Sequence, residues 1–474
     1  GTFKGGQPAT RYEMASVLAR SLAKLDLEKA SKQDVEMMRK LVIEFSDELT
    51  ALGVKLEQLD ERVAVLETDI GGWSIAGQFQ FDLKFTGDNE VNGFYADDAD
   101  IVGKNEFDLN QYRLWLRKRV DENTTFEARF GRPTGGNAGA RLVQWDRYFI
   151  TTRLPYDITL TAGRQLFAPE DDLGLIQDND TWTFDNAFDA MKFTKSWGVA
   201  DILLAVARQN DAAWGTAGHV DLVGGRYDPT ANRILLADTT ESFLIAVNIN
   251  ANFSERFRAG LLGFWRLTDE EVDTDAVPGN DTDHDVSQYG VYAGFKFTPD
   301  IELKGVYYAQ KVGHSVGNYA PAGMFGNVNA EDSSSAWKAI LDVNQEALKF
   351  TSLWLEYGQM DNNYAILGGL NPYAYYGAEI LSARPFNLNT TKILLVRAGQ
   401  QWNDKWDTLL RYVRADFDTT GTPDASNWTF EVGYQYSPAV KFTLGYDNID
   451  YGNYPAPLGK QDDHMIRFRT FVAF

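Results

Sequence analysis

The chain has 474 residues, a formal net charge of -22 at pH 7 and no cysteine. The absence of cysteine excludes disulfides and thiolate metal sites, and the excess of acidic residues argues against binding to the phosphates of nucleic acid. Mean hydropathy is -0.34, and no apolar run approaches the roughly 18 residues that a membrane-spanning helix needs. The four histidines are scattered and form no metal-ligand spacing, so we expect no metal site and no cofactor.

Within residues 1–30, the stretch PATRYEMASVLAR, residues 8–20, indicates a short entry loop followed by an amphipathic helix that continues through Leu22 and Leu25. Thr10 can serve as the N-cap of this helix, and Glu13, three residues later, would complete a capping box. Arg11 offers a planar fork of donors suited to carboxylate or phosphate, although it could equally pair with Glu13 at the surface. These residues are therefore candidates for ligand binding, for helix capping or for both. Because the chain begins inside an apparent motif, we expect residues to precede Gly1.

Residues 31–72 carry a heptad pattern that predicts a coiled coil, with a single amphipathic helix packed on a globular domain as the alternative. The apolar seam comprises Val35, Met38, Val42, Phe45, Leu49, Leu52, Leu56, Leu59, Val63 and Leu66. Charges of opposite sign, such as those of Lys55 and Asp60, fall where parallel chains would pair them across the seam. We therefore expect a parallel homo-oligomer with a stalk on the order of 50 Å long. The seam residues do not decide between two and three strands.

Residues 73–474 repeat a period of two, with apolar and often aromatic residues alternating with polar ones. Segments such as 73–85, 243–253, 257–267, 289–297, 428–436 and 466–474 show it clearly. Alternation over about ten residues, with short turns at one end and long polar loops at the other, is typical of a transmembrane β-barrel. We count 18 antiparallel strands, or 16 if a weak pair around 186–210 is misread. A soluble propeller would need a repeat that is absent, and one sandwich could not hold so many strands.

The same alternation predicts which charged side chains point into the barrel. They are Arg113, Arg117, Arg119, Arg129, Arg256 and Arg258, and the alternative is that some lie at the rim. An arginine facing lipid at mid-depth costs roughly 2–4 kcal/mol, so inward placement has an energetic basis. Arg164 breaks the rule, because it shares parity with the apolar residues of its own strand.

The loop at 167–185 is the third long loop by our count, and it is acidic. Its carboxylates are Glu170, Asp171, Asp172, Asp178 and Asp180. If this loop folds into the barrel, these groups would face the arginines of the early strands and create a transverse field that sorts solutes by charge. The alternative is an ordinary exposed acidic loop.

Two motifs resemble those of known envelope proteins. The C-terminal RFRTFVAF resembles the insertion signal of bacterial outer-membrane barrels, and GTFKGGQPATRYEMASVLAR looks like the second half of an S-layer homology (SLH) domain. SLH piece, coiled coil and barrel in that order resemble the outer-membrane tethering porins of the OmpM/Slp type, found in diderm Firmicutes and related deep-branching bacteria. Tyr12 departs from the alanine that is usual in the SLH motif.

This resemblance implies a homotrimeric porin in the bacterial outer membrane, with its N-terminal stalk in the periplasm. It also implies that Thr10, Arg11 and Glu13 bind peptidoglycan or a modified wall glycan. Our expectation is thus a channel for passive diffusion of ions and small hydrophilic solutes that also tethers the outer membrane. A substrate-specific channel and a structural tether with a closed barrel are the alternatives. An enzyme is not expected, because the few histidines lie in or next to predicted loops, away from a nucleophile and carboxylate.

Overall fold

The computed structural model describes residues 73–86, 105–131, 144–166, 175, 187–209, 225–228, 233–236, 242–268, 286–312, 333–361, 364, 373, 375, 376, 380, 390–418, 424–452 and 462–474. The chain divides into two units, Gly1–Ser74 and Ile75–Phe474. The predicted SLH piece and coiled-coil seam lie outside the described residues. The described residues belong to the second unit and to the start of the strand that leads into it.

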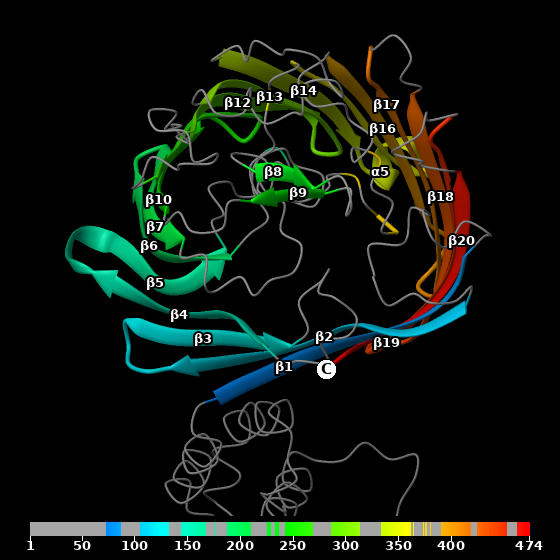
Figure 1. Ribbon diagram of the computed structural model, residues 1–474. Helices are drawn as coiled ribbons and strands as arrows, with labels where there is room; N and C mark the ends of the chain where they lie inside the picture. The colour runs from blue at the N-terminus through cyan, green and yellow to red at the C-terminus, as the bar shows by residue number, and fades with distance from the viewer. Residues whose placement is uncertain are drawn as a thin grey trace, which may run out of the picture. The chain divides into compact units, whose positions relative to one another are not determined.

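The second unit is a closed antiparallel β-barrel of 18 strands (Figure 1). Its strands are β1 (Trp73–Thr86), β2 (Asn105–Arg119), β3 (Thr124–Gly131), β4 (Gln144–Leu154), β5 (Ile158–Leu166), β6 (Ala187–Trp197), β7 (Ala200–Gln209), β10 (Ser242–Asn252), β11 (Phe257–Thr268), β12 (Val286–Thr298), β13 (Ile301–Val312), β14 (Ser333–Val343), β15 (Ser352–Met360), β16 (Thr391–Gln401), β17 (Trp406–Asp416), β18 (Ala425–Ser437), β19 (Val440–Asp450) and β20 (Asp463–Ala473). A separate hairpin pairs β8 (Gly225–Asp228) with β9 (Arg233–Leu236). The predicted count of 18 is confirmed, because β6 and β7 pair with each other and with β5 and β10.

The barrel closes where the first strand meets the last. β1 pairs antiparallel with β20 from Gln78↔Ala473 to Thr86↔Met465. The Phe474 amide donates to the Gly77 carbonyl at 2.9 Å, and the Gly77 amide donates back at 2.7 Å. A Cβ on Gly77 would overlap the ring of Phe474, so glycine makes room for the terminal aromatic side chain. Closure pairs the backbone groups that an open sheet edge would leave exposed to lipid.

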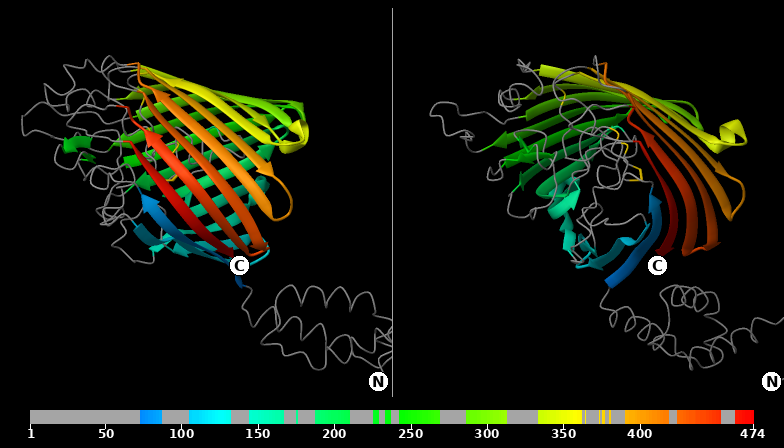
Figure 2. Two further views of the ribbon diagram at one scale, coloured as in Figure 1. Left: turned by 90° about the vertical axis from the view of Figure 1, so that its right-hand side faces the viewer. Right: turned by 45° about the vertical axis from the view of Figure 1, so that its right-hand side comes forward.

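Short connections gather at one end of the barrel and long ones at the other. Turns of a few residues join β2 to β3, β12 to β13, β16 to β17 and β18 to β19, as the sequence predicts (Figure 2). The same end carries the 3-10 turn η1 (Pro155–Asp157) and the one-turn helix α5 (Gln345–Leu348). Asn403 shows how such turns are built, because its side chain accepts the backbone amides of Lys405 and Trp406. Within the described ranges, no helix has the length and apolarity to span a membrane.

The outer face of the barrel is apolar. Side chains such as Leu261, Val291 and Leu303 are 45–57% exposed there, in the middle of their strands. Exposed aromatic residues ring the short-turn end: Trp197, Phe253, Phe297, Phe350, Trp402 and Tyr436. Cross-strand aromatic pairs support the ring, with Trp406 and Tyr434 centroids 4.7 Å apart. An apolar band with an aromatic girdle is the surface that a lipid bilayer requires.

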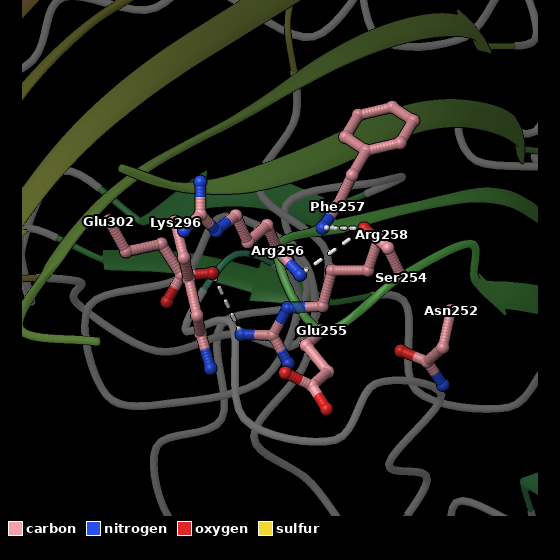
Figure 3. A pocket seen from close by; sticks show the side chains of 8 residues that line it. All are labelled: Asn252, Ser254, Glu255, Arg256, Phe257, Arg258, Lys296 and Glu302. Carbon is pink, nitrogen blue, oxygen red and sulfur yellow. Dashed lines mark hydrogen bonds and ion pairs between the residues drawn. The ribbon is translucent and has the colours of Figure 1, made fainter. Parts of the chain in front are cut away.

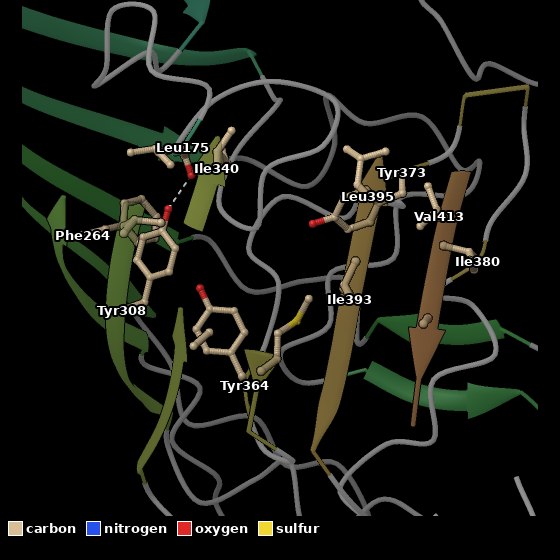
Figure 4. Packing of buried hydrophobic residues seen from close by; sticks show 14 of the residues in the cluster. Leu175, Phe264, Tyr308, Ile340, Tyr364, Tyr373, Ile380, Ile393, Leu395 and Val413 are labelled. Carbon is tan, nitrogen blue, oxygen red and sulfur yellow. Dashed lines mark hydrogen bonds between the residues drawn. The ribbon is translucent and has the colours of Figure 1, made fainter. Parts of the chain in front are cut away.

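The inner face combines polar side chains with a buried apolar cluster to which strands from β6 to β20 contribute. Ile340, Ile393, Leu395 and Val413 point inward and are no more than 1% exposed. Residues of two long connections cover them, among them Leu175, Tyr364, Tyr373 and Ile380 (Figure 4). This core inside the barrel anchors parts of the long loops.

Candidate functional site

A basic wall lines the lumen on three consecutive strands. Arg113 on β2, Arg129 on β3 and Arg147 on β4 share the inward face, and Arg129 and Arg147 are direct partners in the register. The Arg129 guanidinium lies 6.0 Å from the centroid of the Trp115 ring. Arg129 and Arg147 thus place two like charges opposite each other across the strand pair, an arrangement that destabilises a sheet unless neighbouring groups offset it.

The other arginines predicted to line the pore lie closer to the turns. Arg117 forms an ion pair with Glu127 at 3.1 Å, and Arg119 donates to the carbonyls of the turn that follows β2. Arg256 is exposed within the turn between β10 and β11, a rim position. Arg258 is largely buried in an ion pair with Glu302 at 3.2 Å.

A pocket of about 340 Å³ opens beside these last residues, at the short-turn end of β10–β13 (Figure 3). Its charged lining consists of Glu255, Arg256, Arg258, Lys296 and Glu302. The Arg258–Glu302 pair forms one wall. Three cations and two carboxylates therefore line this pocket.

Arg164 lies on the outer face and meets a carboxylate there. Its Nη1 is 3.4 Å from Asp189 Oδ2 on β6, and both residues lie near the long-loop ends of their strands. Position near the strand end and pairing with Asp189 lower the cost of an outward arginine. The exception that Arg164 makes to the alternation is thus explained by its place at a strand end.

The predicted acidic constriction residues between 167 and 185 lie outside the described residues. One member of that loop, Leu175, is described, and it is fully buried inside the barrel. The Tyr308 hydroxyl on β13 donates to the Leu175 carbonyl at 2.6 Å (Figure 4). This contact supports an inward course at that one point of the loop.

A tyrosine cluster from the connection between β15 and β16 also lies against the inner wall. We call Tyr373, Tyr375 and Tyr376 the latch tyrosines. The Tyr373 hydroxyl donates to Glu356 Oε1 at 2.7 Å, and the Tyr373 backbone carbonyl accepts from Arg411 Nη2 at 2.7 Å. Tyr373 has φ 73°, a left-handed conformation that costs a bulky residue on the order of 1–3 kcal/mol and persists only where surrounding contacts impose it.

Glu431 on β18 is the second anchor of this cluster. It accepts hydrogen bonds from Tyr375 at 2.9 Å and from Tyr376 at 2.8 Å. Arg467 on β20 lies 3.4 Å from the same carboxylate and stacks over the Tyr376 ring, 3.5 Å from its centroid. A carboxylate with three donors and an arginine on an aromatic face form a well-satisfied polar network.

Further carboxylates of the inner wall are paired in the same way. Lys338 and Glu356 are fully buried and 3.4 Å apart, and Lys304 pairs with Asp342 at 3.1 Å. Arg469 holds Asp82 through two hydrogen bonds of 2.6–2.7 Å across the closing seam. Among the described residues, these carboxylates of the inner wall each lie beside a cation.

The phenols of Tyr375 and Tyr376 should titrate late. Burial, followed by the negative charge of Glu431, raises the pKa of Tyr375 to about 12, and burial raises the pKa of Tyr376 further. The folded-state pKa lies above the ordinary value near 10. The stabilisation from the neutral phenols is therefore complete below about pH 10 and is lost as the pH rises through 12. A tyrosinate absorbance titration should show a late component that Tyr375→Phe with Tyr376→Phe removes, and its persistence in that variant would contradict the assignment.

Sequence reasoning missed Arg147 and the latch tyrosines. A register shift between Arg129 and Phe130 changes the pairing with β4, so simple alternation does not carry across it. The apolar run in KILLVRAG, residues 392–399, could have indicated that side chains cover the inner face of this strand. Strands that are apolar on both faces are covered on both faces, which implies that something packs inside the barrel beside β16.

Comparisons with known proteins agree with the fold. No protein-family model matches the chain. The uncharacterized protein alr4550 of Nostoc sp. (strain PCC 7120) is 30% identical over 136 residues, which span 27% of this chain and 21% of that relative. The crystal structure of OccK11 (OpdR) of Pseudomonas aeruginosa matches with TM-score 0.50 and 10% identity, covering 85% of this chain and 95% of the other. OccK3 (OpdO) of the same organism gives 0.50 and 11% over the same shares. These two likenesses establish the barrel fold alone.

Proposed function

We propose that the chain is an outer-membrane channel for passive diffusion of ions and small hydrophilic solutes, without enzymatic activity. The observation that carries the proposal is the closed barrel of 18 strands, apolar outside and charged inside. An apolar exterior suits hydrocarbon, and a charged interior suits a water-filled path. His464, the one histidine of the described ranges, stacks with Tyr446 on the outer face, where it has no part in the lumen.

Proteoliposome swelling tests this proposal directly for uncharged solutes. Vesicles containing the folded chain should swell in an isotonic solution of a small sugar, and vesicles with heat-denatured protein should not. Swelling that falls with increasing sugar size would indicate simple diffusion through a pore. Absence of swelling with folded protein would remove the diffusion function.

A specific observation favours the closed structural barrel as a second candidate. The buried apolar cluster of the inner wall and the loop residues that cover it, among them Leu175 and Tyr364, occupy part of the lumen. The tyrosines Tyr292, Tyr308 and Tyr364 are at most 2% exposed, so they form no exposed aromatic track for a specific solute. A closed barrel would give no swelling with any solute, whereas a specific channel would swell with one solute class only.

The basic wall should influence which ions pass. Arg129→Gln with Arg147→Gln is expected to shift the permeability ratio toward cations, because two positive charges leave the lumen. The measurement is the reversal potential in a potassium chloride gradient. Lys349→Gln with Lys405→Gln removes the same charge from exposed turns and serves as the control. An equal shift in both variants would show that general surface charge, and not the wall, sets selectivity.

We also propose that residues 1–72 tether the barrel to the cell wall as part of a homo-oligomer, trimeric by resemblance. The support is the SLH-like motif with Thr10, Arg11 and Glu13, and the unbroken heptad seam that follows it. Such a stalk would place the motif in the periplasm, away from the membrane.

Arg11→Ala is expected to reduce pull-down of the full chain on purified peptidoglycan, since a planar guanidinium suits carboxylate or phosphate groups. Lys4→Ala removes a neighbouring positive charge without touching the Thr-Arg-x-Glu stretch and serves as the control. Equal binding by the Arg11 variant and the parent would leave Arg11 with a structural role only.

A further inference from the structure

We propose that the latch tyrosines dock into a socket on the inner wall and, docked there, narrow the channel. The inference rests on the proposed channel function and adds the element that limits it. The sequence predicts a constriction from the loop at 167–185. The contacts of the described residues give stronger support to the β15–β16 connection.

The latch tyrosines bridge well-separated strands of the barrel. Tyr373 joins Glu356 on β15 to Arg411 on β17 through hydrogen bonds of 2.7 Å at each end. Tyr376 joins Glu431 on β18 to Arg467 on β20. The contacts of the latch tyrosines therefore reach wall residues from β15 to β20, strands that lie in sequence order around the barrel (Figure 1).

The inner wall has space for the Tyr376 side chain because it carries a glycine at that point. Gly445 on β19 faces inward beneath the Tyr376 ring, and a Cβ there would overlap the Tyr376 hydroxyl. The same Cβ would otherwise approach only the Glu431 side chain, at 3.2 Å. Glycine at this point thus leaves the space that the phenol fills, and the barrel backbone needs no glycine for conformational reasons.

The hydrogen-bond acceptors of the socket also explain why the latch tyrosines carry hydroxyl groups. Tyr375 and Tyr376 both donate to Glu431, and Arg467 balances its charge. Tyr373 donates to Glu356, which Lys338 balances. The neutral phenols donate hydrogen bonds to the carboxylates of these two ion pairs and add no charge. If the tyrosines left the wall, the same carboxylates would be exposed to water and to passing ions.

The experiment compares Gly445→Ala, Tyr376→Ala, the double variant and the parent in planar bilayers. Gly445→Ala should expel the ring and raise single-channel conductance roughly twofold, as should Tyr376→Ala, since a constriction dominates the resistance of a pore. The double variant should match Tyr376→Ala, because the added methyl group then meets no ring. Gly399→Ala is the matched control: it also lies on the inner face, and its Cβ meets only the Ser352 hydroxyl at 3.0 Å.

A second readout does not depend on conduction. Chymotrypsin cleavage at the latch tyrosines, followed by mass spectrometry, should be slow in the parent and in Gly399→Ala and rapid in Gly445→Ala. Conductance and cleavage both unchanged in folded Gly445→Ala would overturn the latch. Faster cleavage with unchanged conductance would show that the latch tyrosines do not narrow the channel. A parent protein that never conducts would overturn the proposed channel function, and the cleavage rates alone would then test whether the latch tyrosines dock.

Discussion

Lys338→Met is expected to lower the free energy of unfolding of the barrel by about 3–5 kcal/mol, because it leaves a buried carboxylate without its cation. Lys338 and Glu356 have side chains that are 0% and 1% exposed, with nitrogen and oxygen 3.4 Å apart. Glu356 also accepts from Trp354 and Tyr373, so it is held in place and cannot turn toward water. Urea-dependent loss of the folded form in detergent or lipid, followed by gel mobility, measures the change.

Adding Glu356→Gln to that variant should recover much of the loss, since the amide carries no charge, its oxygen can accept from Trp354 Nε1 and its NH₂ can donate to the Tyr373 hydroxyl. Lys392→Met is the matched control, because its pair with Asp418 is 3.6 Å long and its side chains are 36% and 63% exposed. Exposed pairs contribute about 0–1 kcal/mol. Equal losses for Lys338→Met and Lys392→Met would show that the interior pair is not shielded from water.

Leu261→Arg is expected to destabilise the barrel by about 2–4 kcal/mol in lipid, because it puts a cation on the outer face at mid-strand. Leu261 is 54% exposed on β11, between the outward residues Ala259 and Gly263. The cost arises from contact with hydrocarbon, so it should be far smaller in a water-exposed setting. The measurement is urea unfolding from lipid vesicles.

The depth of the substitution provides the control. Phe257→Arg changes the same face of the same strand at the short-turn end, where the cost of arginine falls to about 0–1 kcal/mol near the interface. A penalty for Leu261→Arg that does not exceed the penalty for Phe257→Arg would contradict a lipid-facing outer wall.

The barrel could be predicted from the sequence because each strand obeys a local rule. Alternation in 243–253 places Phe243, Val247 and Phe253 on one face, and that face is outward in β10. The short turns were also predictable, since the side chains of residues such as Asn403 and Ser254 accept hydrogen bonds from backbone amides two residues further along the chain. Such signals span a few residues and need no knowledge of distant parts of the chain.

The interior was harder to predict because its contacts join residues far apart in the chain. Tyr376 meets Glu431 and Arg467, and Leu175 meets Tyr308. Nothing in the spacing of Tyr373, Tyr375 and Tyr376 shows which wall they face. The predicted constriction residues Glu170–Asp180, the SLH-like residues and the heptad seam lie outside the described ranges and stay predictions.

Single-channel recording in a planar bilayer tests the central claim most directly. The folded chain, inserted from detergent into a membrane in potassium chloride, should produce stepwise increases in current, one for each insertion event. The protein recovered from the bilayer must still migrate as the folded form on a gel. Silence at all voltages with verified, folded insertion would contradict the account, because a barrel that spans the membrane without conducting is a structural element and not a channel.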